Sequence, residues 1–261
     1  MGVLNVTPDS FSDGGAYAQL DAAVRHGQEM FAAGADVVDV GGESTRPGSA
    51  AQVDAATEIG RVVPVIRALR EHGHGLISVD TTKAAVADAA LSAGADLVND
   101  VSALRFDPAM GPLVARRDVP VVLMHSRGAF DALHTAPHYD DLAGEVVAEL
   151  GQALRRAAEL GIHTERTLVD PGIGFAKDAG HSLEALRRLD ELAVLDRPIL
   201  IGPSRKSFIG KTLGRPVGER LHGTAAAVAA CVLGGAHVVR VHDVASMVDV
   251  VRLCDAVRGT A

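Results

Sequence analysis

The chain has 261 residues, of which 48% are hydrophobic, 22% are charged and only 3% are aromatic. Its formal net charge of −8 argues against a general nucleic-acid binder or a membrane-surface protein, because both need a basic face. No apolar run is long enough to span a bilayer, and the first residues lack the basic start of a signal peptide, so we expect a cytoplasmic protein. Cys231 and Cys254 fall in helical patterns and are expected to be reduced thiols in the core.

Short apolar runs rich in Val, Ile and Leu recur along the chain and predict eight strands that are buried on both faces of a parallel sheet. In chain order they are Gly2–Val6, Val37–Val40, Leu76–Asp80, Leu97–Asn99, Pro120–Met124, Thr167–Asp170, Ile199–Ile201 and Val238–Val241. Helical stripes lie between them, for example at Leu20, Val24, Gly27 and Phe31. No linker, fixed repeat or low-complexity tract divides the chain, so we predict one domain over residues 1–261.

Strands that alternate with helices in this way predict an α/β fold, a single (β/α)8 barrel with its site at the C-terminal ends of the strands. A doubly wound open sheet is the alternative. That fold needs a glycine-rich dinucleotide loop after the first strand, and the segment Thr7–Gly15 contains no GxGxxG pattern.

One set of polar residues at the strand ends combines carboxylates with an amide: Asp80, Asn99 and Asp170. Buried carboxylates are costly unless they are paired. A ligand that presents several N–H donors in one plane, such as the edge of a guanidine-like heterocycle, would pair with them. The alternative for each residue is that it caps the next helix or binds a loop amide.

A second set is cationic: Arg46, Lys206, Arg240 and His242. Because side chains alternate along a strand, Arg240 and His242 point the same way, and phosphate or pyrophosphate is the anion that fits them best. Arg240 has an alternative partner in Asp170 or Asp80, as an internal ion pair. Asn5 beside such a phosphate could help to hold Mg²⁺, which commonly bridges phosphate and protein oxygens.

The remaining histidines give weaker signals. No HxH or HExxH spacing supports a zinc site. The polar stretch His125–Tyr139, which includes His134, is expected to be a mobile loop.

Seven motifs occur in order along the chain: Asn5–Gly15, Asp39–Gly48, Ser78–Thr81, Asn99–Ser102, Leu168–Phe175, Ser204–Phe208 and Arg240–Asp243. Together they resemble the dihydropteroate synthase family of folate biosynthesis, and the resemblance covers essentially the whole chain. It implies that p-aminobenzoate is joined to 6-hydroxymethyl-7,8-dihydropterin pyrophosphate, which gives 7,8-dihydropteroate and pyrophosphate.

The resemblance also assigns roles to residues. It implies a pterin site at Asp80, Asn99, Met124, Asp170, Phe175, Lys206 and Arg240. It implies a pyrophosphate site at Asn5, Arg46, Arg240 and His242, with Mg²⁺ at Asn5. It implies a p-aminobenzoate site, open to sulfonamides, at Phe11, Thr45, Pro47 and Ser207. The residues expected to carry the catalysis are Asp170, Lys206, Arg240 and His242.

Two alternatives to a synthase stay open at this point: a non-catalytic pterin-binding paralogue, and a methyltransferase that passes a methyl group from methyltetrahydrofolate to a corrinoid. We expect a homodimer, formed through the last helices near Ala225–Cys231. The loops Thr7–Gly15 and Glu43–Ser49 are expected to be mobile until pyrophosphate and the second substrate bind.

Overall fold

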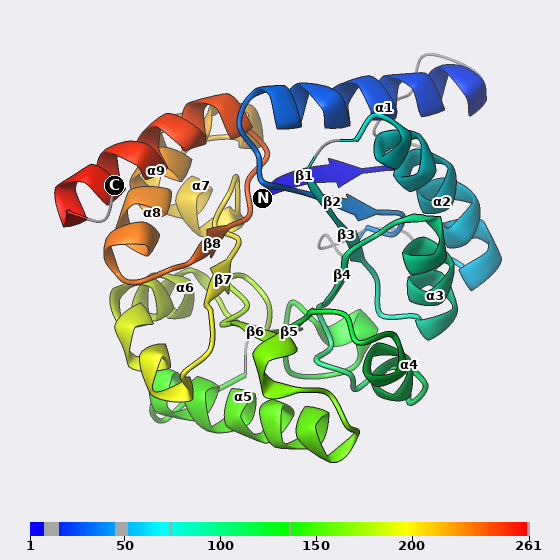
Figure 1. The fold of residues 1–261 in the computed structure, drawn as a ribbon. Helices are drawn as coiled ribbons and strands as arrows, with labels where there is room; N and C mark the ends of the chain where they lie inside the picture. Colours follow the sequence, from blue (N-terminus) through cyan, green and yellow to red (C-terminus); the bar gives the residue numbers. More distant parts are fainter. Residues whose placement is uncertain (8–15, 45–51, 74, 136, 260–261) are drawn as a thin grey trace.

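Parallel strands ring the centre of the molecule and helices surround them on all sides (Figure 1). The structure is a computed structural model, and it describes residues 1–7, 16–44, 52–73, 75–135 and 137–259. The (β/α)8 barrel that the sequence predicts is therefore confirmed, and the doubly wound open sheet is excluded.

The eight strands lie close to their predicted positions. They are β1 Gly2–Asn5, β2 Val37–Gly41, β3 Leu76–Asp80, β4 Leu97–Asp100, β5 Val121–Met124, β6 Thr167–Asp170, β7 Leu200–Ile201 and β8 Val238–Val239. The last two are shorter than predicted, so Arg240 lies just beyond β8. Its N–H still donates to the carbonyl of Ile201 at 2.9 Å, which keeps the pairing with β7 at this level.

The described part of the chain has nine α-helices rather than eight, because two of them connect β7 to β8. The helices are α1 Ala16–Ala32, α2 Ala55–Glu71, α3 Ala84–Ala93, α4 Met110–Arg117, α5 Leu142–Glu159, α6 Ala179–Arg187, α7 Ser207–Leu213, α8 Leu221–Leu233 and α9 Val244–Arg258. Short 3-10 helices are η2 Phe130–Ala132, η3 Thr164–Arg166, η4 Leu189–Leu195 and η5 Val217–Glu219.

The barrel consists of two sheets joined at two seams. Strands β1 to β6 pair in sequence order, and β7 pairs with β8. Single bridges close the ring, from Gly2 in β1 to Val241 after β8 and from Val169 in β6 to Ile199 before β7. The seams on either side of β7 and β8 are thus the least regular part of the barrel.

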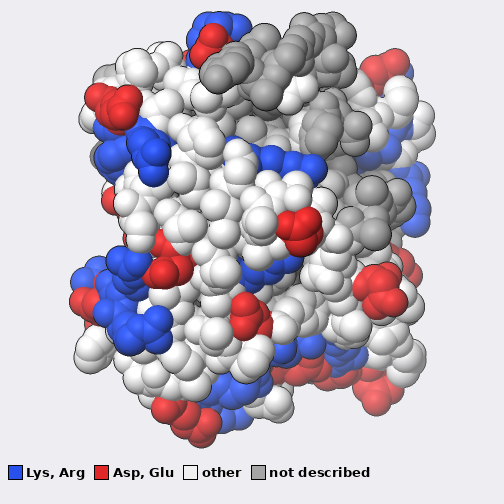
Figure 2. Space-filling view, turned by 90° about the vertical axis from the view of Figure 1, so that its right-hand side faces the viewer, with Lys and Arg blue, Asp and Glu red and all other residues white. Residues whose placement is uncertain are grey.

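Aliphatic side chains fill the layer between the strands and the helices. Fully buried members include Leu4, Ile77 and Leu123 on the strands, and Ile66 and Leu150 on helices. Cys231 and Cys254 are buried free thiols, as predicted. On the face shown in Figure 2, basic and acidic side chains are interspersed. No described helix is long and apolar enough to cross a membrane.

Strand register brings the polar strand ends to one level. Asn5 pairs in register with Gly41, Gly41 with Asp80, and Asp80 with Asn99. Because these pairs join neighbouring parallel strands, their side chains gather at the same C-terminal rim of the barrel.

The turn after β6 is tightly packed against the segment after β5. Gly172 has φ +69°, and a Cβ atom there would lie 2.0 Å from the backbone oxygen of His125. Gly172→Ala should therefore lower the free energy of unfolding by about 2–3 kcal/mol. The control is Gly60→Ala at an exposed position of α2, where nothing lies within 4 Å of the added Cβ atom; this change should stabilise the protein by about 0.5–1 kcal/mol. Urea denaturation measures both, and equal effects would contradict the prediction.

Candidate active site

Arg240 pairs with the carboxylates of two other strands at the mouth of the barrel. Its Nε donates to Asp39 Oδ2 at 2.6 Å and its Nη2 donates to Asp80 Oδ2 at 2.8 Å. Asp39 is 0% exposed, and its Oδ1 is buried without a hydrogen bond among the described residues. The internal pair between Arg240 and Asp80 that the sequence left open is present, and Asp39 is an additional partner.

Asn99 belongs to the same group through Asp39. Its Nδ2 donates to Asp39 Oδ2 at 3.0 Å in a buried contact. Burial raises the pKa of Asp80, and the negative charges of Asp39, Glu58 and Asp100 act in the same direction, while Arg240 opposes them. The rim near β2 to β4 is therefore rich in negative charge that one arginine only partly balances.

Asp170 and Lys206 are two further charged groups of the mouth; each acts electrostatically on the other, while Lys206 Nζ donates to the carbonyl of Ile173. Asp170, 6% exposed, accepts the N–H of Gly172 on its Oδ1 at 2.7 Å. Burial raises the pKa of Asp170, and the positive charges of Lys206 and Lys177 work against that rise. Burial also lowers the pKa of Lys206 to about 8. The protonation states of both groups can thus change when a charged or hydrogen-bonding ligand binds.

An apolar wall stands beside this pair. Met124 and Phe175 pack in one cluster with Val101 and Leu133. The Phe175 ring lies 5.0 Å from Lys206 Nζ, and the His134 ring stacks on it at 4.9 Å. A flat face next to a lysine and a carboxylate suits a flat heterocycle with polar edges.

The predicted anion site is described only in part. His242 donates its backbone N–H to Ser204 Oγ at 3.2 Å, and its Nδ1 lies 3.0 Å from the same oxygen. Ser207 is exposed at the first turn of α7. Four predicted site residues lie outside the described residues: Phe11, Thr45, Arg46 and Pro47. The two loops expected to be mobile also fall largely outside them.

Asn5 is the residue predicted to help to hold Mg²⁺. The described residues contain no group of three or more His, Cys, Asp or Glu side chains that could hold a metal by themselves. Asn5 lies at the end of β1, and its side-chain oxygen is 3.8 Å from the position a Cβ would take on Gly41, beside Asp80. One amide oxygen of this kind fits a Mg²⁺ ion whose other ligands are phosphate oxygens and water.

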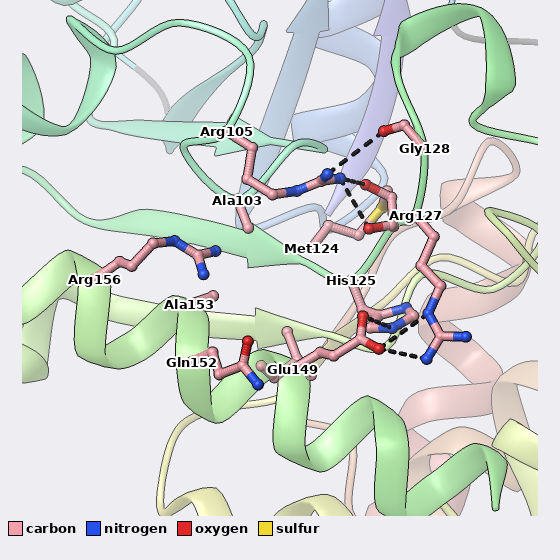
Figure 3. A pocket seen from close by; sticks show the side chains of 12 residues that line it. Ala103, Arg105, Met124, His125, Arg127, Gly128, Glu149, Gln152, Ala153 and Arg156 are labelled. Atoms are coloured by element: carbon pink, nitrogen blue, oxygen red, sulfur yellow. Dashed lines mark hydrogen bonds and ion pairs between the residues drawn. The ribbon is translucent and has the colours of Figure 1, made fainter. Parts of the chain in front are cut away.

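A chain of four polar residues behind the wall was not predicted from the sequence. Lys177 is 4% exposed, and its Nζ lies 2.8 Å from His125 Nδ1. His125 Nε2 lies 3.1 Å from Glu149 Oε2 on α5, and Glu149 Oε1 accepts Arg127 Nε at 3.0 Å. Figure 3 shows Glu149, His125 and Arg127 turned toward one another. The His125–Tyr139 stretch is thus tied down by buried contacts at its start.

A hollow of about 340 Å³ lies on the side of β5 that faces α5 (Figure 3). Its lining includes His125, Arg127 and Glu149, together with Arg105 and Arg156. Arg105 Nη2 is bound to the carbonyl and hydroxyl oxygens of Ser126. Asp39, Asp80 and Arg240 do not line this hollow, but Met124 does, so the hollow lies next to the mouth and shares Met124 with its apolar wall.

Another unpredicted cluster holds the chain on both sides of residues 45–51. Lys83 Nζ lies 3.0 Å from Glu43 Oε2 and 2.6 Å from Glu58 Oε2. Glu43 Oε1 accepts the N–H of Val53 at 2.7 Å. The two ends of this segment are therefore fixed to one carboxylate beside the mouth.

A parallel barrel with buried carboxylates and cations at its C-terminal rim defines a barrel enzyme with a polar heterocycle site, and comparison with known proteins agrees. The family model described as pterin binding enzyme matches residues 1–242. The chain is 47% identical to dihydropteroate synthase of Mycobacterium leprae, over 98% of this chain and 92% of that protein.

Solved structures give the same result. The structure of dihydropteroate synthase from Clostridium difficile in the presence of pteroic acid has a TM-score of 0.93 and 42% identity, and covers 98% of this chain and 95% of its own. The structure of the Xanthomonas albilineans synthase with 4-aminobenzoic acid has a TM-score of 0.93 and 45% identity. That match covers 100% of this chain and 93% of the other chain. The chain belongs to the dihydropteroate synthase family, which makes it a transferase of folate biosynthesis. The family resemblance in the sequence is confirmed.

Asp39 provides a test of the buried ion pair. Asp39→Asn removes one of the two carboxylate charges that face Arg240 without changing the size of the side chain, and should cost about 2–3 kcal/mol of stability because Arg240 keeps only Asp80 as a charged partner. The control is Asp88→Asn on the surface, where Asp88 accepts Arg117 Nε at 2.9 Å. That exposed pair should contribute less than about 1 kcal/mol. Chemical denaturation compares the two, and similar losses would show that burial does not decide the cost.

Proposed function

We propose that the pterin ring binds flat against Phe175 and Met124, with its N–H edge on Asp170. The observation that carries this proposal is the placement of a buried carboxylate and a lysine beside one aromatic ring. Asp170 accepts adjacent N–H donors of the pterin, and Lys206 donates to an acceptor atom of the ring. Asn99 and Asp80 take the remaining polar edge.

In the proposed reaction, the bond between the pterin methylene carbon and the pyrophosphate oxygen breaks first. The electron pair leaves with pyrophosphate, and positive charge develops on the pterin methylene. The Asp170 carboxylate stabilises that charge through the N–H edge. The arylamine of p-aminobenzoate then forms the new C–N bond with its lone pair and releases a proton to solvent or to pyrophosphate. Because an arylamine is a weak nucleophile, holding it in line matters more than activating it.

The pyrophosphate end of the substrate is assigned to Arg240, His242, Arg46 and Asn5. Asn5 would hold a Mg²⁺ ion that arrives with the pyrophosphate and neutralises its charge. Arg240 is already shared between Asp39 and Asp80, so it balances the acidic rim and the departing anion together.

The second substrate is assigned to Ser207, Phe11, Thr45 and Pro47, of which the structure describes only Ser207. The Xanthomonas albilineans relative, solved with 4-aminobenzoic acid, supports this substrate class. Sulfonamides, which mimic p-aminobenzoate, should compete for the same position. The proposal includes a cytoplasmic location, which the sequence suggested because no apolar run is long enough to span a bilayer.

The test of the proposed reaction is the release of pyrophosphate from 6-hydroxymethyl-7,8-dihydropterin pyrophosphate in a coupled assay. Release should require p-aminobenzoate and Mg²⁺, and it should proceed without a corrinoid partner. Pterin binding without turnover would instead favour the non-catalytic paralogue.

Asp170→Asn should weaken pterin binding while the fold stays intact. Loss of a charge-assisted pair costs roughly 1.5–3 kcal/mol, or about one to two powers of ten in affinity. Asp249→Asn, an exposed change on α9, is the matched control and should bind pterin like the unaltered protein. Calorimetric titration measures the affinity. A dissociation constant for Asp170→Asn within twofold of that of the control would contradict the proposed contact between Asp170 and the pterin.

We also propose a homodimer, since large apolar side chains are exposed on the last helices. Leu253 is 67% exposed and Val257 is 71% exposed, both on α9. Leu253→Glu should therefore weaken self-association and give a monomer by light scattering at micromolar concentration. The control is Leu160→Glu, because Leu160 is 42% exposed at the end of α5, away from α9. If Leu253→Glu keeps the mass of the unaltered protein, this face is not the interface.

A further inference from the structure

Lys177 is the buried charge that the proposed reaction leaves unused. The chain has only four lysines: Lys83, Lys177, Lys206 and Lys211. Lys177 is 4% exposed and forms no ion pair within 4 Å with any described carboxylate. Its Nζ donates to the carbonyl of Phe175 at 3.2 Å and lies 2.8 Å from His125 Nδ1. Burying an ammonium group without a direct counter-ion costs free energy of folding, which indicates that the charge has a role in this place.

The contacts of His125 fix its tautomer. An ammonium group can only donate, so charged Lys177 donates a hydrogen bond to the lone pair of Nδ1. Nε2 then carries the ring hydrogen and donates to Glu149 Oε2 at 3.1 Å. Burial lowers the pKa of His125 to about 4, so the imidazole ring is neutral at neutral pH. The backbone N–H of His125 donates to the carbonyl of Asp170 at 2.8 Å. His125 therefore joins Lys177 to the residue that ends β6.

The opposite charge that acts most strongly on Lys177 is Asp170. Burial lowers the pKa of Lys177 to about 7. The negative charge of Asp170 raises that pKa more than any other charge does. In return Lys177 favours the ionised form of Asp170, alongside Lys206. Lys206 faces the ring of Phe175 in the mouth, whereas Lys177 binds the backbone carbonyl of the same residue. The charges of both lysines thus act on Asp170, and His125 joins Lys177 to the backbone carbonyl of Asp170.

We propose that Lys177 is a positioning residue for the pterin: from behind the wall it keeps Asp170 as a carboxylate and fixes the backbone of Phe175, while His125 and Glu149 hold it in place. This inference rests on the proposed contact between Asp170 and the pterin. Lys177 does not touch the substrate. It determines the charge and the place of the groups that do.

The pair can be tested in the ligand-free protein by NMR of protein labelled with 13C at the lysine ε carbons. The four signals are assigned with Lys→Gln variants. In the unaltered protein the Lys177 signal should titrate near pH 7, and in Asp170→Asn its midpoint should fall by about one pH unit, because a charge nearby shifts a pKa by about 1–3 units. Exposed Lys211 is the reference in the same spectrum and should not move. An unchanged Lys177 midpoint in Asp170→Asn would overturn the proposal.

The second measurement is the affinity for pterin as a function of pH. Lys177→Gln keeps a donor toward His125 and Phe175 but removes the charge. Because a lost positive charge lets Asp170 take up a proton at higher pH, the acid limb of the affinity profile should move up by about one pH unit. Lys211→Gln, which removes one exposed charge, should keep the original profile. A purely structural Lys177 would leave the limb in place, and that result also overturns the proposal.

The other titratable groups near Lys177 and Asp170 remain present in these variants. They are Lys206, Arg240, His125, Glu149, Arg127 and Cys231. Should Lys177→Gln fail to fold, the lysine titration of the unaltered protein and of Asp170→Asn decides the matter. The pterin contact of Asp170 and the role of Lys177 can fail independently. Unchanged pterin affinity in Asp170→Asn would remove the proposed pterin contact. Lost affinity in that variant with an unchanged Lys177 midpoint would remove only the role of Lys177.

Discussion

The buried contact of Arg240 with Asp39 and Asp80 is the constraint on which the mouth of the barrel depends. It joins the end of β8, one of the two shortest strands, to β2 and β3 across the seam that a single bridge closes. Two unit charges about 4 Å apart gain about 4 kcal/mol at an effective dielectric constant of about 20. Removing them from water costs several kcal/mol for each ion. The contact is therefore a poor source of stability, and its main effect is to fix charged groups at the mouth of the barrel.

Charge in the mouth is divided by position. Asp39, Asp80 and Asn99 occupy the rim of β2 to β4, and Lys206 stands beside Asp170 on the other side. Each buried carboxylate keeps a cation near it, but none is fully neutralised: Asp39 still has one buried oxygen without a described partner. Groups held at such a cost gain most from a ligand that completes their hydrogen bonds, which is the physical basis of tight and selective binding of a polar heterocycle.

The sequence was sufficient for the features that depend on local pattern. Period and composition predicted each strand, and Asp80, Asn99 and Asp170 were recognised because they end apolar runs. Asp39 was given no role because it lies within such a run, although strand alternation alone places it on the opposite face from Val38 and Val40. The link from His125 to Lys177 could not be predicted, since it joins residues 52 positions apart through a turn at Gly172 whose path only the fold determines.

The backbone that carries the apolar wall of Met124 and Phe175 is held by hydrogen bonds to a neighbouring segment. Ala176 has φ +47°, a conformation that costs about 1–3 kcal/mol for a residue with a Cβ atom. It persists because Leu133 accepts its N–H at 2.6 Å and the Tyr139 hydroxyl donates to its carbonyl at 2.9 Å. The segments after β5 and β6 thus brace each other, and Phe175 lies between braced neighbours. A wall that is already ordered spares the ligand the entropic cost of arranging it, so more of the binding free energy remains for the polar edge. The strain at Ala176 is therefore consistent with a site whose aromatic face must be fixed relative to Asp170.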